Sequence, residues 1–191
     1  MATKNIMIVG VGGQGTLLAS KLLGAVLLDM GYDVKVSEVH GMSQRGGSVV
    51  TYVKFGDKVY SPIIDKGEAD IILSFELLEA ARWAEYLKPG GQMIINTQKM
   101  EPMPVIIGDA LYPENIVEKL EAKGAKVDAL DFLSIANEAG SSKAVNIALM
   151  GRLSNYYKEI PEKTWDDAIC KIVPPKFLEL NKKAFAAGKN A

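Results

Sequence analysis

Residues 6–15 read Ile6-Met7-Ile8-Val9-Gly10-Val11-Gly12-Gly13-Gln14-Gly15. The first four residues are apolar, as is typical of a buried strand in a parallel sheet. The next six match the pattern G-x-G-x-x-G, and the largely apolar residues 16–30 that follow predict a helix. A strand, a glycine turn and a helix in direct succession favour an α/β fold.

The alternation of strand-like and helix-like segments continues along the chain. It predicts further strands at residues 33–39, 48–55, 69–75, 92–96 and 126–132, and helices at residues 76–87 and 115–122. We therefore expect an α/β fold with a Rossmann-like, mostly parallel sheet and helices on both faces. Residues 48–55 and 58–60 flank Gly56-Asp57, which predicts an inserted β-hairpin.

The residues after about position 140 predict helices only, and we expect them to form a helical C-terminal arm. Ser141 or Ser142 can cap the first of these helices, and Gly188 is expected to end the last one. Since no linker, repeat or low-complexity segment divides the sequence, we expect a single domain over residues 1–191.

Composition excludes several classes of function. The 191 residues carry 22 basic and 23 acidic side chains, so a nucleic-acid surface is not expected. The sequence has neither the run of roughly 18 apolar residues that spans a bilayer nor the pattern of a signal peptide. Cys170 is the only cysteine, and one thiolate cannot hold an iron–sulfur cluster. These features favour a cytoplasmic protein without membrane contact, and they place any redox centre on another chain.

The glycine loop of residues 10–15 has three interpretations. Gly10, Gly12 and Gly15 can let a dinucleotide approach the unpaired N–H groups of a helix N-terminus, and Glu38 then lies near the position of a ribose-binding acid. The same glycines can serve only a tight turn and close strand–helix packing. The loop can also form part of a surface that faces a partner chain or the partner's cofactor.

A second loop is unusual for a connecting segment. It reads Glu38-Val39-His40-Gly41-Met42-Ser43-Gln44-Arg45-Gly46-Gly47 and holds the only histidine of the chain. Arg45 can clamp a phosphate or a carboxylate, or it can form an internal ion pair. Ser43 and Gln44 can hydrogen-bond a polar ligand, and His40 can donate a proton or serve the structure alone. Both loops should leave the carboxyl ends of neighbouring strands and meet at one edge of the sheet.

Together the two loops resemble a known family. Gly10-Val11-Gly12-Gly13-Gln14-Gly15, followed by His40-Gly41-Met42-Ser43-Gln44-Arg45-Gly46-Gly47-Ser48, resembles the gamma-type subunits of 2-oxoacid:ferredoxin oxidoreductases. The form of the second loop is similar to that of the beta subunits of indolepyruvate ferredoxin oxidoreductases. Residues 69–75, Glu79 with Arg82, residues 146–151, and Asn181 with Ala184, Phe185 and Gly188 also fit the family pattern.

The resemblance implies a division of labour between subunits. A partner alpha subunit would carry thiamine diphosphate, its Mg²⁺ and the iron–sulfur clusters. The holoenzyme would decarboxylate an aryl 2-oxoacid, reduce ferredoxin and form an acyl-CoA from coenzyme A. This chain would then bind no cofactor or metal alone, and no catalytic residue is assigned to it. Its sequence agrees, since Gly108-Asp109-Ala110 does not complete the Gly-Asp-Gly…Asn-Asn pattern of a thiamine diphosphate site.

The residues expected to face the partner or its cofactor come from the two loops. They are Gly10, Gly12, Gly13, Gln14, Gly15, Glu38, His40, Gly41, Ser43, Gln44, Arg45, Gly46 and Gly47. The alternative function is a free-standing dinucleotide-binding oxidoreductase, and a third reading is a pure assembly module. Whether the isolated chain pairs with a second copy stays open.

Overall fold

The structure of the protein is a computed structural model, and it describes residues 3–41 and 46–191. Six strands form one sheet in these residues. The strands are β1 (Lys4–Val11), β2 (Asp33–His40), β3 (Ser48–Gly56), β4 (Ala69–Ser74), β5 (Leu87–Asn96) and β6 (Lys126–Leu130). Their order across the sheet is β2-β3-β1-β4-β5-β6. Strands β1, β4, β5 and β6 run parallel to one another, which confirms the mostly parallel α/β sheet.

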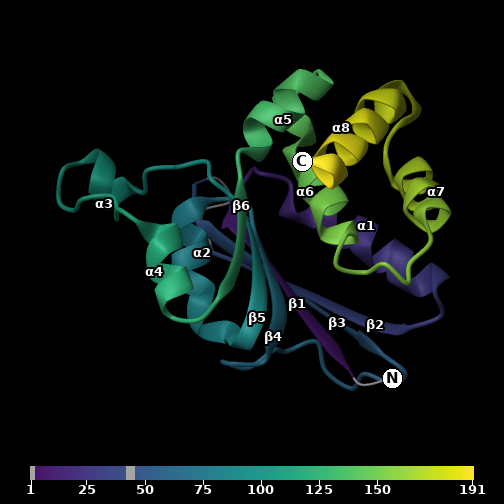
Figure 1. The fold of residues 1–191 in the computed structure, drawn as a ribbon, viewed down its shortest axis with the longest axis horizontal. Coiled ribbons are helices and arrows are strands. Elements are labelled where there is room, and N and C mark those ends of the chain that lie inside the picture. Colours follow the sequence, from purple (N-terminus) through teal and green to yellow (C-terminus); the bar gives the residue numbers. More distant parts are fainter. Residues whose placement is uncertain (1–2, 42–45) are drawn as a thin grey trace.

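The helices lie on both faces of this sheet (Figure 1). They are α1 (Thr16–Asp29), α2 (Leu77–Trp83), α3 (Met103–Ile106), α4 (Ile116–Ala122), α5 (Phe132–Ala139), α6 (Val145–Ser154), α7 (Glu162–Ile172) and α8 (Leu178–Asn190). Short 3₁₀ helices lie at Ala84–Tyr86, Ser142–Ala144 and Pro175–Phe177. The start of α1 at Thr16 agrees with the prediction from the sequence.

The antiparallel insertion is confirmed, but its second strand was placed wrongly. β3 pairs antiparallel with β1 along one edge and with β2 along the other, so the hairpin consists of β2 and β3. Because both edges of β3 are occupied, Lys58-Val59-Tyr60 has no edge of β3 to pair with and forms no strand. Val59 N–H instead donates to the Asp33 carboxylate at 2.8 Å, and Tyr60 is exposed.

Two hydrophobic cores lie on the two faces of the sheet, and alternate residues of β1 point into each. Ile6 and Ile8 belong to the core under α1 and the C-terminal helices. Met7 and Val9 belong to the core under α2 and α4. The sheet therefore contributes side chains to both cores, as expected of an α/β sheet covered on both faces.

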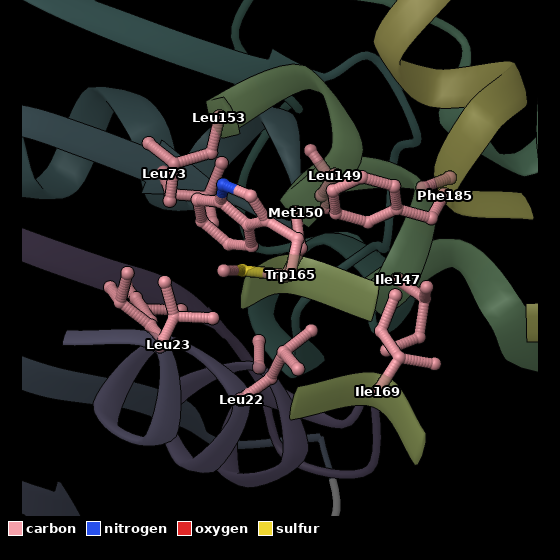
Figure 2. Close-up of a cluster of buried hydrophobic side chains, with 14 of the residues drawn as sticks. Leu22, Leu23, Leu73, Ile147, Leu149, Met150, Leu153, Trp165, Ile169 and Phe185 are labelled. Atoms are coloured by element: carbon pink, nitrogen blue, oxygen red, sulfur yellow. The ribbon is translucent and has the colours of Figure 1, made fainter. Parts of the chain in front are cut away.

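The C-terminal helices are confirmed, and they build much of the first core. Trp165 of α7 and Phe185 of α8 lie among Leu22 and Leu23 of α1 and Leu149 of α6 (Figure 2). The rings of Trp165 and Phe185 are 5.7 Å apart between centroids. The C-terminal helices thus cover the sheet rather than project from it.

Gly188 does not end the last helix, as the sequence had suggested, because α8 continues to Asn190. An added Cβ at Gly188 would lie 1.9 Å from the Ala148 carbonyl oxygen of α6. At Gly151 of α6 an added Cβ would lie 2.0 Å from the Phe185 carbonyl oxygen. The two glycines let α6 and α8 approach backbone to backbone.

Candidate functional site

The two loops identified from the sequence meet at the carboxyl edge of β1. Gly12 N–H donates to the Gly47 carbonyl oxygen at 2.8 Å, and Gly46 N–H donates to the Gly12 carbonyl oxygen at 3.4 Å. This pair of backbone hydrogen bonds joins the glycine loop to the end of the second loop. The expected meeting of the loops at one edge is confirmed for Gly12, Gly46 and Gly47.

The strands that carry the loops are not neighbours, contrary to the expectation from sequence. β3 lies between β1 and β2. Since β3 is antiparallel to both, β1 and β2 point in the same direction and both loops still leave from one edge. With strands about 4.8 Å apart, Glu38 lies on a strand about 10 Å from β1 rather than beside it. This spacing differs from the dinucleotide fold, in which the acid follows the strand adjacent to the glycine loop.

The glycines of the first loop have distinct structural reasons. Gly13 has φ 101° and Gly15 has φ 87°, a region that favours glycine. Gly15 is the N-cap of α1, and an added Cβ there would lie 2.6 Å from the Asn146 side-chain nitrogen. An added Cβ at Gly10 would lie 2.9 Å from Cβ of Phe75. Packing therefore accounts for Gly10 and Gly15, whereas Gly13 has open space around it.

The Gln14 side chain turns back into the protein. Its Oε1 accepts from Val11 N–H at 2.8 Å, and its Nε2 donates to the Phe75 carbonyl oxygen at 3.0 Å. Gln14 thus links the ends of β1 and β4, and its amide contributes to the shape of the loop rather than to an open ligand surface.

Two clefts flank the glycine loop. The smaller has a volume of about 350 Å³ and is lined by Gly12, Gly13, Gly15, Thr16, Leu17, Glu38 and Val49. The larger has a volume of about 710 Å³ and is lined by Gly12, Gly13, Gln14, Gly15, Gly46, Gln98, Met100, Leu133, Ser142, Lys143, Val145 and Asn146. Both clefts include the start of α1, whose first N–H groups have no partner within the helix. The larger cleft adds the Lys143 ammonium group, so its lining suits an anionic ligand.

Glu38 lies in the smaller cleft and leaves one oxygen without a hydrogen bond. Its Oε2 is buried and has no partner among the described residues, and the same holds for Oγ1 of Thr51. Glu38 and Thr51 are cross-strand partners in β2 and β3, so their side chains share a face of the sheet. Glu38 can therefore accept a hydrogen bond from a group outside the described residues.

The rest of the second loop is described only in part. His40 is the last residue of β2 and pairs with Val49 through the backbone. Gly41 is exposed. Ser43, Gln44 and Arg45, which we predicted to contact a polar or anionic ligand, lie outside the described residues. Their roles remain predictions.

Sequence analysis named Glu79 with Arg82 through the family resemblance, but it did not predict that two carboxylates are buried beside these loops. Glu76 is 1% exposed and Glu79 is 4% exposed, and both lie at the start of α2. Glu76 accepts hydrogen bonds from Glu79 N–H, Met100 N–H and Tyr112 Oη at 2.8, 3.0 and 2.5 Å. Burial raises the pKa of Glu79, and the nearby Ser48 hydroxyl and Arg82 guanidinium partly oppose this shift. The only sequence signal was the charge pair Glu79 and Arg82 within an otherwise apolar helix.

Three further features of the described residues concern metal ligands, membrane-spanning helices and the cysteine. Residues 3–41 and 46–191 contain no cluster of three or more His, Cys, Asp or Glu side chains arranged to hold a metal ion. In the same residues no helix combines the length and apolarity needed to cross a membrane. Cys170 is exposed and free.

Comparison with known proteins identifies the class of protein. Residues 5–191 match the family model described as pyruvate ferredoxin/flavodoxin oxidoreductase. The chain belongs to this family, and it is a subunit of a 2-oxoacid:ferredoxin oxidoreductase. It is 45% identical to the indolepyruvate oxidoreductase subunit IorB of Thermococcus kodakarensis, over 100% of this chain and 96% of that protein. The resemblance found in the two loops is confirmed.

Solved structures share the fold. A pyruvate oxidoreductase subunit from Thermotoga maritima has a TM-score of 0.77 at 19% identity, covering 100% of this chain and 97% of that chain. A 2-oxoglutarate:ferredoxin oxidoreductase from Magnetococcus marinus, solved with 2-oxoglutarate, coenzyme A and succinyl-CoA bound, also has a TM-score of 0.77, at 20% identity. This chain is covered completely but spans 31% of the Magnetococcus chain, so the same fold occurs there within a longer polypeptide.

Proposed function

We propose that this chain is the subunit without cofactors of an indolepyruvate:ferredoxin oxidoreductase, and that its joined loops form a surface toward the partner subunit and coenzyme A. The holoenzyme converts an aryl 2-oxoacid and coenzyme A to an acyl-CoA and CO₂, and ferredoxin takes up the electrons. The observation that carries the proposed surface is the pair of hydrogen bonds between Gly12 and the Gly46–Gly47 segment. It brings the glycine loop and the Gly46–Gly47 end of the second loop together at one edge of the sheet.

The substrate part of the proposal rests on similarity over the whole chain. Relatives from Thermococcus kodakarensis and Pyrococcus horikoshii, at 45% and 44% identity, are both indolepyruvate oxidoreductase subunits. A pyruvate/ketoisovalerate oxidoreductase subunit gamma from Thermococcus kodakarensis is 26% identical. The higher identity to the first group favours an aryl 2-oxoacid.

The cofactors belong to the partner in this proposal. Thiamine diphosphate with Mg²⁺ and the iron–sulfur clusters reside on the alpha subunit, which passes electrons to ferredoxin. A single cysteine, Cys170, fits this assignment because a cluster usually takes four thiolates. A reduced thiol also fits a cytoplasmic location.

In this proposal the chain's own residues bind an anion and shape the edge of the sheet that faces the partner. The start of α1 and Lys143 offer N–H groups and a positive charge to an anion in the larger cleft, and phosphate groups of coenzyme A are such anions. Arg45 would add a planar guanidinium to the same edge. A closed edge would also keep water away from the partner's active site.

The first experiment is purification of the native complex followed by activity assays with indolepyruvate, phenylpyruvate, pyruvate and 2-oxoglutarate. We expect a large iron–sulfur partner to co-purify and turnover to be highest with the aryl substrates. A chain that purifies alone and is stabilised against heating by NAD(P) or FAD would instead support the dinucleotide-binding alternative.

The second experiment tests the loop surface with Arg45→Ala. Loss of a charge-assisted hydrogen bond to an anion should lower kcat/KM of the assembled holoenzyme about tenfold or more. The matched control is Lys126→Ala, which removes an exposed positive charge at the amino end of β6, on the opposite edge of the sheet. An assembled Arg45→Ala enzyme with unchanged activity would refute the ligand-facing role and leave the assembly role.

A further inference from the structure

Helix α2 holds two carboxylates that are buried at the carboxyl edge of the sheet. Burying a carboxylate costs free energy unless other groups compensate it. Glu76 is compensated fully, since two N–H groups and a phenol donate to it. It caps α2 and anchors residues 100–112, which explains its presence by structure alone.

Glu79 makes a different set of contacts. Its Oε2 accepts from the Ser48 hydroxyl and from Trp83 Nε1 at 3.3 Å. Its Oε1 lies 3.2 Å from Nε of Arg82. Two of the three partners belong to its own helix, so Ser48 is the only one of these three contacts that reaches another element.

Ser48 lies where the second loop joins β3. It is the first residue of β3 and directly follows Gly47, whose carbonyl oxygen accepts from Gly12 N–H. The contact from Glu79 therefore fixes the chain at the point where the second loop joins the glycine loop. A small cleft of about 100 Å³ at this point is lined by both loop ends and α2, including Val11, Gly46, Ser48, Glu79 and Arg82.

We propose that Glu79 is a positioning residue that fixes the Gly46–Ser48 end of the second loop against the glycine loop, so that the ligand meets a preformed surface. This inference rests on the proposed function of that surface. Without Glu79, the Gly12–Gly47 contact forms in only a fraction of molecules, and ligand binding must supply the ordering. The apparent affinity then falls in proportion to that fraction.

The chemistry of Glu79 argues against a purely structural role. An apolar side chain of similar size would fill the same space without burying a charge, and such replacements are often neutral or stabilising. The carboxylate oxygens of Glu79 are directional acceptors that an apolar side chain lacks, and one of them accepts from the Ser48 hydroxyl.

The test compares Glu79→Ala, Glu79→Gln and Ser48→Ala in the assembled holoenzyme, with Glu118→Ala as control. Glu118 is an exposed carboxylate on α4, which covers the same face of the sheet as α2. We expect Glu79→Ala to raise KM for coenzyme A about tenfold while kcat changes less than about twofold. A tenfold rise in KM corresponds to the loss of about one charge-assisted hydrogen bond. Glu79→Gln keeps an acceptor for the Ser48 hydroxyl and should restore most of the affinity. Glu118→Ala should behave as wild type.

A double-mutant cycle and hydrogen exchange make the test specific. Glu79→Ala and Ser48→Ala should not add, because both remove the same contact. Amide exchange over residues 46–50 should quicken in Glu79→Ala and return toward wild type in Glu79→Gln. An unchanged KM in Glu79→Ala, or additive effects of the two variants, would overturn the proposal. If Glu79→Ala does not assemble, the Glu79→Gln and Ser48→Ala variants and their exchange rates decide.

Arg45→Ala measured in parallel separates the two proposals. If Arg45→Ala impairs turnover and Glu79→Ala does not, the surface functions but Glu79 does not position it. If neither variant affects KM or kcat, the proposed function of the surface fails, and the positioning role fails with it.

Discussion

At the scale of single residues, the loops combine backbone requirements with side chains that serve them. Gly13 and Gly15 adopt positive φ; the G-x-G-x-x-G pattern after a strand predicts a tight glycine turn here, but Gly13 occupies one of its variable positions. The inward turn of Gln14 was not predictable, because its partner Phe75 is 61 residues away along the chain. The contact of Glu79 with Ser48 was not predictable for the same reason, since the two residues lie 31 positions apart and only the fold brings them together.

The buried state of Glu79 gives a prediction about stability and pH. Burial raises its pKa from the ordinary value of 4.5. Well below pH 4.5 the group is protonated in both the folded and the unfolded chain and does not affect the free energy of unfolding. Above pH 4.5 the unfolded chain loses this proton first, so Glu79 increasingly disfavours the folded state until the pH passes the raised pKa of the folded chain. The Glu79→Gln side chain does not ionise, so the variant does not lose free energy of unfolding in this way.

The free energy of unfolding of Glu79→Gln, relative to wild type, should therefore increase between pH 4.5 and about 7. Urea denaturation of the full chain at the two pH values measures it. Glu118→Ala serves as the control, because its carboxylate is exposed. A relative stability of Glu79→Gln that stays constant or falls with pH would contradict the prediction.

At the scale of elements, periodicity predicted most strands and helices but not their pairing. The antiparallel character of residues 48–55 was foreseen, whereas their partner β2 was not, because Gly56-Asp57 offered a stronger local turn signal than the loop after His40. Helix α5 was missed because the strand-like run 126–132 continues into Phe132 without a break, although Asp131 caps this helix by accepting from Ser134 N–H at 3.0 Å. Local patterns do not encode which strand edge is free.

The surroundings of two helical glycines, one in the α6–α8 contact and one in α1, predict opposite effects of their substitution by alanine. Gly188→Ala would place Cβ 1.9 Å from the Ala148 carbonyl oxygen, and the two helix backbones must separate. We expect a loss of about 3 kcal/mol in the free energy of unfolding. Gly24→Ala in α1 meets no heavy atom within 4 Å and should stabilise by about 0.5–1 kcal/mol. Chemical denaturation of the full chain measures both, and equal effects of the two substitutions would rule out the close helix contact as the cause.

At the scale of the whole molecule, the sheet joins two cores. Ile6 and Ile8 face one core, and Met7 and Val9 face the other, so loss of β1 pairing would expose both. The C-terminal helices share the first core with α1, and Arg152 of α6 pairs with Asp128 of β6 at 2.7 Å. An independent C-terminal arm would lack such contacts. We therefore propose that residues 1–191 unfold cooperatively as a single domain.

The two tryptophans make this test direct, because each reports one face of the sheet. Trp165 is buried in the core under the C-terminal helices, and Trp83 packs against the core under α2 and α4. In Trp83→Phe the fluorescence reports the first core, and in Trp165→Phe it reports the second.

In each variant the fluorescence transition in urea should coincide with the loss of helix measured by far-ultraviolet circular dichroism, as two-state unfolding requires. If the Trp165 signal changed at lower urea than the circular dichroism of the same variant, the C-terminal helices would unfold separately and the chain would not behave as one domain. Comparing each variant with its own circular dichroism removes the effect of the substitution on overall stability, so coincidence in both variants would establish that the sheet couples the two cores.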